Sequence, residues 1–175
     1  MQNSRHKLWR LSVLSAAMAL LMACSQSAQA PAQAGDFAQD TPCALDGMVL
    51  ADYPGPKGQI LYADGQTEFF CDTVELIAAL LHPEQQRKRA GAWVNDMGKA
   101  DWDAPRGHWI EAQSAVYVKD SRKRGAMGPT LVPFAEVAAA QAFIAKEGGK
   151  LLHFNEINAD AVALDGGALH DTRSH

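Results

Sequence analysis

Residues 59–71 have the sequence QILYADGQTEFFC, and the expected fold follows from this stretch. Two largely apolar runs, 59–63 and 67–71, flank Asp64-Gly65, a strong signal for a two-residue hairpin turn. The following segment, 72–75, places Asp and Glu three positions apart, a spacing suited to capping the start of a helix. We therefore expect a β-hairpin that is followed directly by a helix.

The same order of elements occurs twice along the chain. The first helix should end near Leu81, because Pro83 cannot continue it, and a strand is expected over 92–95. The second half contains extended segments at 108–111 and 115–119, an Ala-rich helix over 135–146 that ends at Gly148-Gly149, and a strand over 151–154. The sequence thus predicts an α+β fold of two similar small β-β-α-β units, 43–103 and 104–157, followed by a loose tail, 158–175.

The first 23 residues have the pattern of a bacterial secretory signal. Three basic residues precede an apolar run over 11–22, which is shorter than the roughly 20 residues needed to span a bilayer. The run ends in LMAC at 21–24, which resembles a lipobox, so Cys24 is the expected lipidation site. An ordinary cleavage site or an uncleaved anchor is the alternative. Ser25 after the cysteine, in place of Asp, favours the outer membrane.

Residues 24–42 are rich in Ala, Gln, Ser and Pro and predict a flexible, lipidated linker. Removal of the signal leaves 13 Lys and Arg against 20 Asp and Glu, a formal charge near −7. This charge argues against nucleic acid as a partner, because phosphate binding needs a basic face. With Cys24 acylated, only Cys43 and Cys71 remain as thiols, in a compartment that oxidises them.

Residues 43–48, CALDGM, place a thiol and a thioether five positions apart. Both are soft ligands of the kind that selects Cu(I). A thioether carries no charge and binds weakly, which suits delivery of a metal better than storage. Cys43 and Cys71 have two open alternatives: they form a disulfide, the default in an oxidising space, or they bind metal with loss of the thiol proton.

The mature chain has three methionines, Met48, Met97 and Met127, and each adjoins a glycine. Core methionines usually fill gaps within helices or strands, whereas a Met beside Gly more often lies at the end of an element. These residues are either contributors to a shared metal cleft or three ordinary packing residues.

A polar loop at 96–102 contains two acids, and His108 lies nearby. These groups either hold a second, harder ion such as Zn²⁺ or serve as surface and hydrogen-bonding groups. No G-x-S-x-G, H-E-x-x-H or C-x-x-C pattern occurs, and nothing else indicates a nucleophile with a paired base. The sequence therefore predicts a protein that is not an enzyme.

Taken in order, the motifs of this chain resemble those of the NosL family, whose members are lipoproteins encoded with bacterial nitrous oxide reductase. No single motif is specific to the family, but the occurrence of all of them in this order is specific. The matching pieces are the lipobox at 21–24 and the segments 43–48, 52–60, 69–73, 94–98, 109–112, 126–129 and 148–149.

The resemblance implies a periplasm-facing chaperone that binds Cu(I) and passes it to nitrous oxide reductase for assembly of its copper-sulfide centre. It also implies Cys43 and Met48 as primary ligands and Met127 as a further ligand. Cys71 and Met97 are second-tier candidates, and the role of Cys71 is open between ligand, disulfide partner and core residue. The rival interpretation is a structural assembly factor that docks on a periplasmic partner, with Cys43 and Cys71 in a disulfide.

Overall fold

The structure is a computed structural model, and it describes residues 32–81 and 87–162. The expected signal sequence, the lipobox with Cys24 and the end of the tail, 163–175, lie outside the described residues. Within the described ranges, no helix combines the length and the apolar character needed to cross a membrane.

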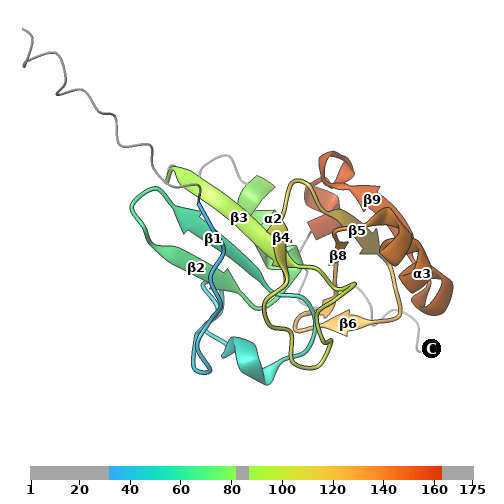
Figure 1. The fold of residues 1–175 in the computed structure, drawn as a ribbon, viewed down its shortest axis with the longest axis horizontal. Helices are drawn as coiled ribbons and strands as arrows, with labels where there is room; N and C mark the ends of the chain where they lie inside the picture. Colours follow the sequence, from blue (N-terminus) through green and yellow to red (C-terminus); the bar gives the residue numbers. More distant parts are fainter. Residues whose placement is uncertain (1–31, 82–86, 163–175) are drawn as a thin grey trace, which may run out of the picture. The chain divides into compact units, whose positions relative to one another are not determined.

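The first β-β-α-β unit forms where residues 59–75 predict it (Figure 1). Its elements are β1 (Gly58–Tyr62), β2 (Thr67–Phe70), α2 (Thr73–Leu81) and β3 (Arg89–Asn95). The hairpin turn is tight because Gly65 adopts a positive φ of 84°. The strands pair antiparallel in the order β2-β1-β3-β4, where the short edge strand β4 spans Trp109–Glu111.

The second unit repeats this topology with different strands from those expected. Its elements are β5 (Val116–Lys119), β8 (Val132–Phe134), α3 (Val137–Glu147) and β9 (Lys150–His153), in the antiparallel order β8-β5-β9. The expected α+β fold with two β-β-α-β units is confirmed, but the assignment of the extended segment 108–111 to the second unit is wrong. It pairs with β3 in the first sheet. The first sheet therefore includes a strand from beyond the expected boundary at 103/104.

Short elements complete the described chain. A 3-10 turn, η2 (Leu50–Asp52), precedes β1, and the small hairpin of β6 (Arg124–Gly125) and β7 (Gly128–Pro129) lies between β5 and β8. Two further 3-10 turns, η3 (Phe154–Glu156) and η4 (Ala159–Val162), follow β9. Val162 is buried in the main core, so the chain is still packed beyond Asn158, where a loose tail was expected to begin.

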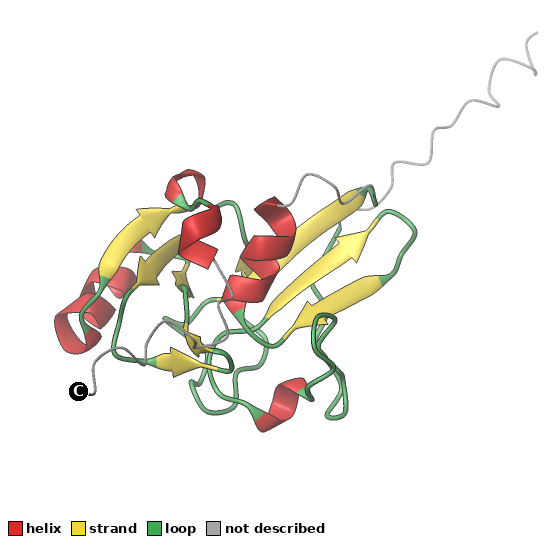
Figure 2. Cartoon of the chain, turned by 180° about the vertical axis from the view of Figure 1, so that it is seen from behind, coloured by secondary structure: helices red, strands yellow, loops and turns green. Residues whose placement is uncertain are grey.

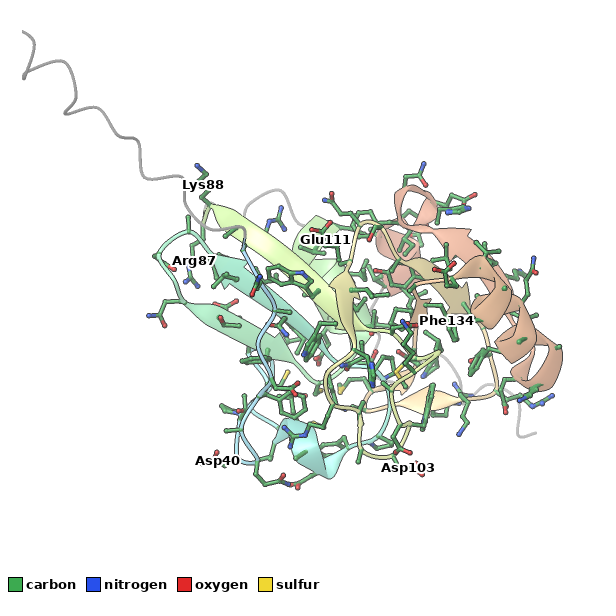
Figure 3. All side chains as sticks on the ribbon, viewed as in Figure 1. Asp40, Arg87, Lys88, Asp103, Glu111 and Phe134 are labelled. Atoms are coloured by element: carbon green, nitrogen blue, oxygen red, sulfur yellow. The ribbon has the colours of Figure 1, made fainter. Side chains whose placement is uncertain are left out.

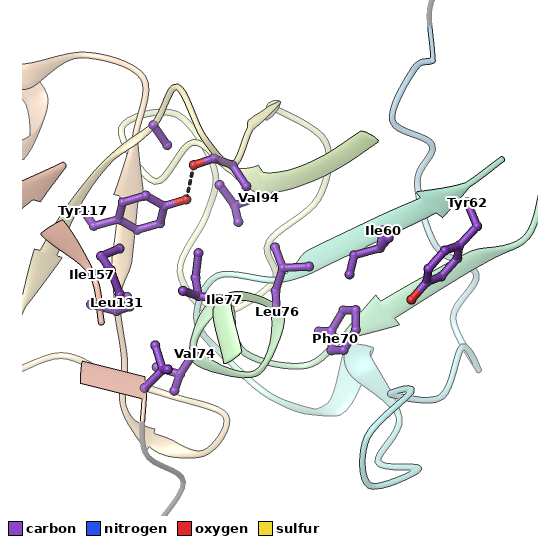
Figure 4. Close-up of a cluster of buried hydrophobic side chains, with 13 residues drawn as sticks. Ile60, Tyr62, Phe70, Val74, Leu76, Ile77, Val94, Tyr117, Leu131 and Ile157 are labelled. Carbon is purple, nitrogen blue, oxygen red and sulfur yellow. Dashed lines mark hydrogen bonds between the residues drawn. The ribbon is translucent and has the colours of Figure 1, made fainter. Parts of the chain in front are cut away.

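The main core joins the two units around α2 (Figure 4). Leu76 and Ile77 of α2 pack in one cluster with Ile60 of β1 and with Tyr117 of β5. The Tyr117 hydroxyl donates a 2.5 Å hydrogen bond to the carbonyl oxygen of Ala112, so its polar end is satisfied inside the core. The two units therefore share this main core, and a separate cluster of buried side chains lies within the second unit.

The opposite face of the first sheet is covered by the segment that precedes Cys43. Seen from behind in Figure 2, α2 lies over one face of the sheet, and in Figure 1 the blue segment crosses the other. Gly35 and the Gln59 side chain exchange two hydrogen bonds of 2.7 and 3.0 Å, and Phe37 packs edge-on against Phe69. Residues 35–37 are thus fixed on the domain, within the range expected to be a flexible linker.

Candidate metal centre

The segment 43–48 folds back on itself and brings its two ends together. The Cys43 N–H donates to the Met48 carbonyl oxygen at 2.7 Å, and Pro42 and Val49 form an isolated β-bridge. The turn is closed by Gly47 at a φ of 77° and by the Asp46 carboxylate, which accepts from the Met48 N–H at 2.9 Å. The Asp-Gly pair therefore places the thiol residue and the thioether residue side by side.

Two cysteines and one glutamate converge beside this loop. Cys71 lies between β2 and α2, and its N–H donates to the Cys43 sulfur at 3.5 Å. Glu75, in the first turn of α2, places its Oε2 within hydrogen-bond distance of both sulfur atoms, 3.2 Å from Cys43 and 3.3 Å from Cys71. In the structure both cysteines are free thiols, not the disulfide of the alternative interpretation.

Four potential metal ligands meet at this point. Ligand atoms of Cys43, Asp46, Cys71 and Glu75 all lie within 4.8 Å of one another. Asp46 is exposed, whereas the other three are buried, so the group is closed on most sides and open at Asp46. The second carboxylate oxygen of Glu75, Oε1, is buried without a hydrogen-bond partner in the structure. A buried acceptor of this kind normally has a partner, and a metal ion would supply one.

The pKa values of the three buried acidic groups in this cluster are shifted from their ordinary values. The pKa of Cys43 is lowered to about 6, chiefly because the Cys71 thiol donates to its sulfur, although burial opposes the shift. That same hydrogen bond, together with burial, raises the pKa of Cys71. Burial and the neighbouring Cys43 thiolate raise the pKa of Glu75 to about 7. Cys43 therefore provides a thiolate near neutral pH, which is the form that binds metal.

A buried lysine supports the cluster from behind. Lys57 has no exposed surface, and its ammonium donates to the carbonyl oxygens of Tyr53, Pro54 and Cys71 at 2.9–3.1 Å. Burial lowers the pKa of Lys57, and the nearby acidic groups, first among them Cys71, oppose this shift. The lysine thus ties the loop before β1 to the backbone of Cys71 and places a positive charge beside several acidic groups.

Of the two predicted thioether ligands, Met48 packs against the thiols, whereas Met127 is connected to this region through its backbone and its neighbour. Met48 is half-buried and packs against a small apolar cluster, here called the thiol cluster, made of Phe37, Cys43, Leu50 and Cys71. Met127 lies between β6 and β7 and is 42 % exposed. Its N–H donates to the Asp72 carboxylate at 3.3 Å, and the preceding Ala126 packs on the thiol cluster.

The structure does not bring Met97 to the thiols. Met97 packs in the core of the second unit, with Trp102, Phe143 and the Phe134 ring that is labelled in Figure 3. Its position beside a glycine marks a turn, as expected, but that turn faces a different core. Met97 is therefore a packing residue in this structure.

The acids and the histidine near residue 100 are also used elsewhere. Asp96 is buried, and its Oδ1 accepts from the N–H groups of Gly98 and Ala135, both at 3.1 Å. His108 contributes its carbonyl oxygen, which accepts from the Asp96 N–H. Among residues 32–81 and 87–162, the cluster at Cys43 is the only group of three or more such ligands that could hold a metal.

Sequence reasoning missed Glu75 and Asp46 as members of the cluster. Glu75 was assigned only to the helix cap, and this role is confirmed: its Oε2 accepts from the Asp72 N–H at 3.3 Å. The additional signal is its spacing: Glu75 follows Cys71 by four positions across the start of α2, and the turn of the chain there brings the two side chains together.

Comparisons with known proteins identify the family of this chain. The family model named NosL matches residues 34–162. The copper-binding lipoprotein NosL of Stutzerimonas stutzeri is 39% identical over 140 residues, covering 77% of this chain and 73% of that protein. The protein of the same name from Achromobacter cycloclastes is 38% identical over 160 residues, or 89% and 82% of the two chains.

A solved structure matches as well. The crystal structure of the copper chaperone NosL from Shewanella denitrificans is 36% identical in sequence and superposes with a TM-score of 0.69. The match covers 75% of this chain and 99% of that one. Sequence and fold lead to one conclusion: the chain belongs to the NosL family.

Proposed function

We propose that this protein carries Cu(I) at the cluster of Cys43 and Cys71 and delivers it to a recipient, without catalytic turnover. The observation that supports this most strongly is the convergence of two thiols and one carboxylate in a buried site with one open side. Thiolate ligands favour a soft ion such as Cu(I). The relatives named copper-binding lipoprotein and copper chaperone support the same assignment.

In this proposal, Cys43 supplies the thiolate and Met48 and Met127 supply thioethers. Cys71 is a second-tier ligand, and its hydrogen bond to Cys43 favours the Cys43 thiolate before the metal arrives. Because thioether ligands are weak and one side of the site is open, a ligand of the recipient can replace them one at a time.

The proposed recipient is nitrous oxide reductase, as apo-enzyme, during assembly of its copper-sulfide centre. The proposed location is the periplasmic side of a bacterial membrane, in particular the outer membrane, with a lipid on Cys24 as the anchor. An anchor confines the domain near the membrane and raises its local concentration there. The lipobox and the lipoprotein names of the relatives support this placement.

The test is a Cu(I) titration of the full chain under reducing, anaerobic conditions, in competition with a chromogenic Cu(I) chelator. Loss of a residue that only supports a metal ligand weakens metal binding by roughly 10- to 100-fold. Cys43→Ala removes a ligand itself and should weaken Cu(I) binding by more than this. Met48→Ala should weaken it less, because a thioether is the weaker ligand. Wild-type affinity in both variants would overturn the copper site and favour the structural assembly factor. Transfer is tested separately, by whether the copper-loaded chain restores activity to the apo-enzyme.

A further inference from the structure

Asp72 makes more contacts than a helix cap requires. Its Oδ1 accepts from the Val74 N–H at 3.0 Å, which caps α2. The same oxygen accepts from the Thr130 hydroxyl at 2.6 Å, and Oδ2 accepts from the Met127 N–H at 3.3 Å. The two additional donors belong to the β6–β7 hairpin and the residue that follows it, 55 and 58 positions further along the chain.

Capping alone does not explain a carboxylate at this position. Asp72 has no exposed surface, and burial raises its pKa to about 6. Burying a carboxylate costs free energy, whereas Ser or Asn caps a helix about as well as Asp does. A carboxylate is therefore explained only if both of its oxygens are needed as hydrogen-bond acceptors, one for the helix cap and one for the hairpin.

The hairpin that Asp72 holds has little structure of its own. Its ladder consists of two residue pairs, Arg124 with Pro129 and Gly125 with Gly128. A two-stranded hairpin is at best marginally stable alone, so the position of Met127 depends on what fixes the base of the hairpin.

Close packing at Gly125 adds to this attachment. A Cβ atom on Gly125 would lie 2.2 Å from Asp72 Oδ2, and a Cβ atom on Gly55 would lie 2.6 Å from the Gly125 Cα. Glycine at both positions lets the hairpin backbone approach Asp72 and the loop before β1.

We propose that Asp72 is a positioning residue for copper: it fastens the hairpin that carries Met127 to the start of α2, directly beside Cys71, so that the thioether reaches the thiols. This rests on the proposed function, in which Met127 is a ligand. Asp72 itself does not touch the metal. It fixes two ligand-bearing segments, the α2 start and the hairpin, relative to each other.

The test is a double-mutant cycle in Cu(I) affinity, measured on the full chain with the same chelator competition. Asp72→Asn keeps one acceptor for the cap but removes the acceptor for the Met127 N–H. It should weaken binding about as much as Met127→Leu does, about tenfold, as for other supports of a metal ligand. The double variant should bind no more weakly than either single variant. Combined with Met48→Leu, by contrast, Asp72→Asn should give the product of the two single losses.

Thr130→Val separates positioning from capping, because it removes a hairpin donor and leaves the Asp72 bond to Val74 intact. It should give a smaller loss of affinity that also disappears in the Met127→Leu background. Gly125→Ala acts from the hairpin side and should weaken binding, whereas the control Gly35→Ala, which has open space at its Cβ position, should not. If Asp72→Asn fails to fold, which circular dichroism would reveal, the Thr130 cycle carries the test.

Two results would overturn the proposal: losses at Asp72 and Thr130 that multiply with the loss at Met127, or wild-type affinity in Met127→Leu. Failure of the proposed function has a different signature. In that case Cys43→Ala also binds Cu(I) like the wild type, whereas failure of the positioning role alone leaves the Cys43→Ala loss in place.

Discussion

The two β-β-α-β units have the same strand order, but only the first buries charged and reactive side chains. The difference is concentrated at the junction between the second strand and the helix. In the first unit this junction is Cys71-Asp72, which is fully buried, and the Asp72 carboxylate caps the helix. In the second unit it is Ala135-Glu136, where Glu136 is exposed and its side chain makes no cap bond.

This comparison separates scaffold from chemistry. The second unit has a core of Val, Phe and Ala side chains and contributes to the site through the short β6–β7 hairpin between its strands. The first unit places two thiols, two carboxylates and one lysine at the same end of its sheet, at a cost in desolvation. Changes in the second core should therefore alter stability alone, and changes at the first junction should alter stability and metal binding together.

The largest effect on stability is expected from Phe134→Ala in the second core. Phe134 is 1% exposed, and removal of a buried aromatic ring costs about 3–5 kcal/mol of unfolding free energy. Chemical denaturation should reveal this loss, while the folded protein keeps its Cu(I) affinity. A large fall in affinity would show that the units are not separable in the way described here.

Lys57→Met is the corresponding change in the first unit. It leaves three carbonyl acceptors without their donor, and the Cys71 carbonyl among them is buried. An unsatisfied buried group costs about 1–3 kcal/mol, so the loss should be about 3 kcal/mol. Unlike Phe134→Ala, it should also weaken Cu(I) binding, because the Cys71 backbone loses its anchor. Lys88→Met is the matched control, since Lys88 is exposed and should change stability by only about 0.5 kcal/mol or less.

A further effect on stability is expected from pH. The folded-state pKa values of Asp72 and Glu75, about 6 and about 7, lie above the ordinary values of 3.8 and 4.5. Between these limits the folded protein binds more protons than the unfolded chain, so the copper-free protein should lose stability as the pH rises from about 4 to 7. The lowered pKa of Cys43 acts in the opposite direction from pH 6 to 9 and should end the decline.

Thermal unfolding of the copper-free protein under reducing conditions, at intervals of pH, measures this dependence. Glu75→Gln should flatten the decline, because it removes one of the two groups responsible. A decline of the same size in Glu75→Gln, or a rise in stability over this range, would contradict the assignment.

Much of the first unit could be predicted from local sequence, because its signals are local. The Asp64-Gly65 turn and the Asp72-to-Glu75 spacing depend only on neighbouring residues, and both form as expected. The second unit was harder, because Pro133 argues against a strand. In the structure Pro133 lies in β8, an edge strand, where a missing N–H donor is tolerated.

The site residues also divide into those that a local sequence pattern indicates and those that only the folded chain reveals. Cys43 and Met48 are joined by a six-residue turn, and soft-ligand chemistry alone indicates them. Lys57 could not be predicted, because buried lysines are rare and its three acceptors come together only in the folded chain. The separation of Met97 from the thiols likewise depends on which core its turn faces, and no local pattern contains that information.

The most direct test of the central claim is X-ray absorption at the copper edge of the full chain loaded with Cu(I), wild type against Cys43→Ala. The account predicts a first shell with sulfur neighbours in the wild type, and loss of a sulfur neighbour in the variant. A first shell of nitrogen and oxygen alone, or a sulfur shell that is unchanged in Cys43→Ala, would contradict it.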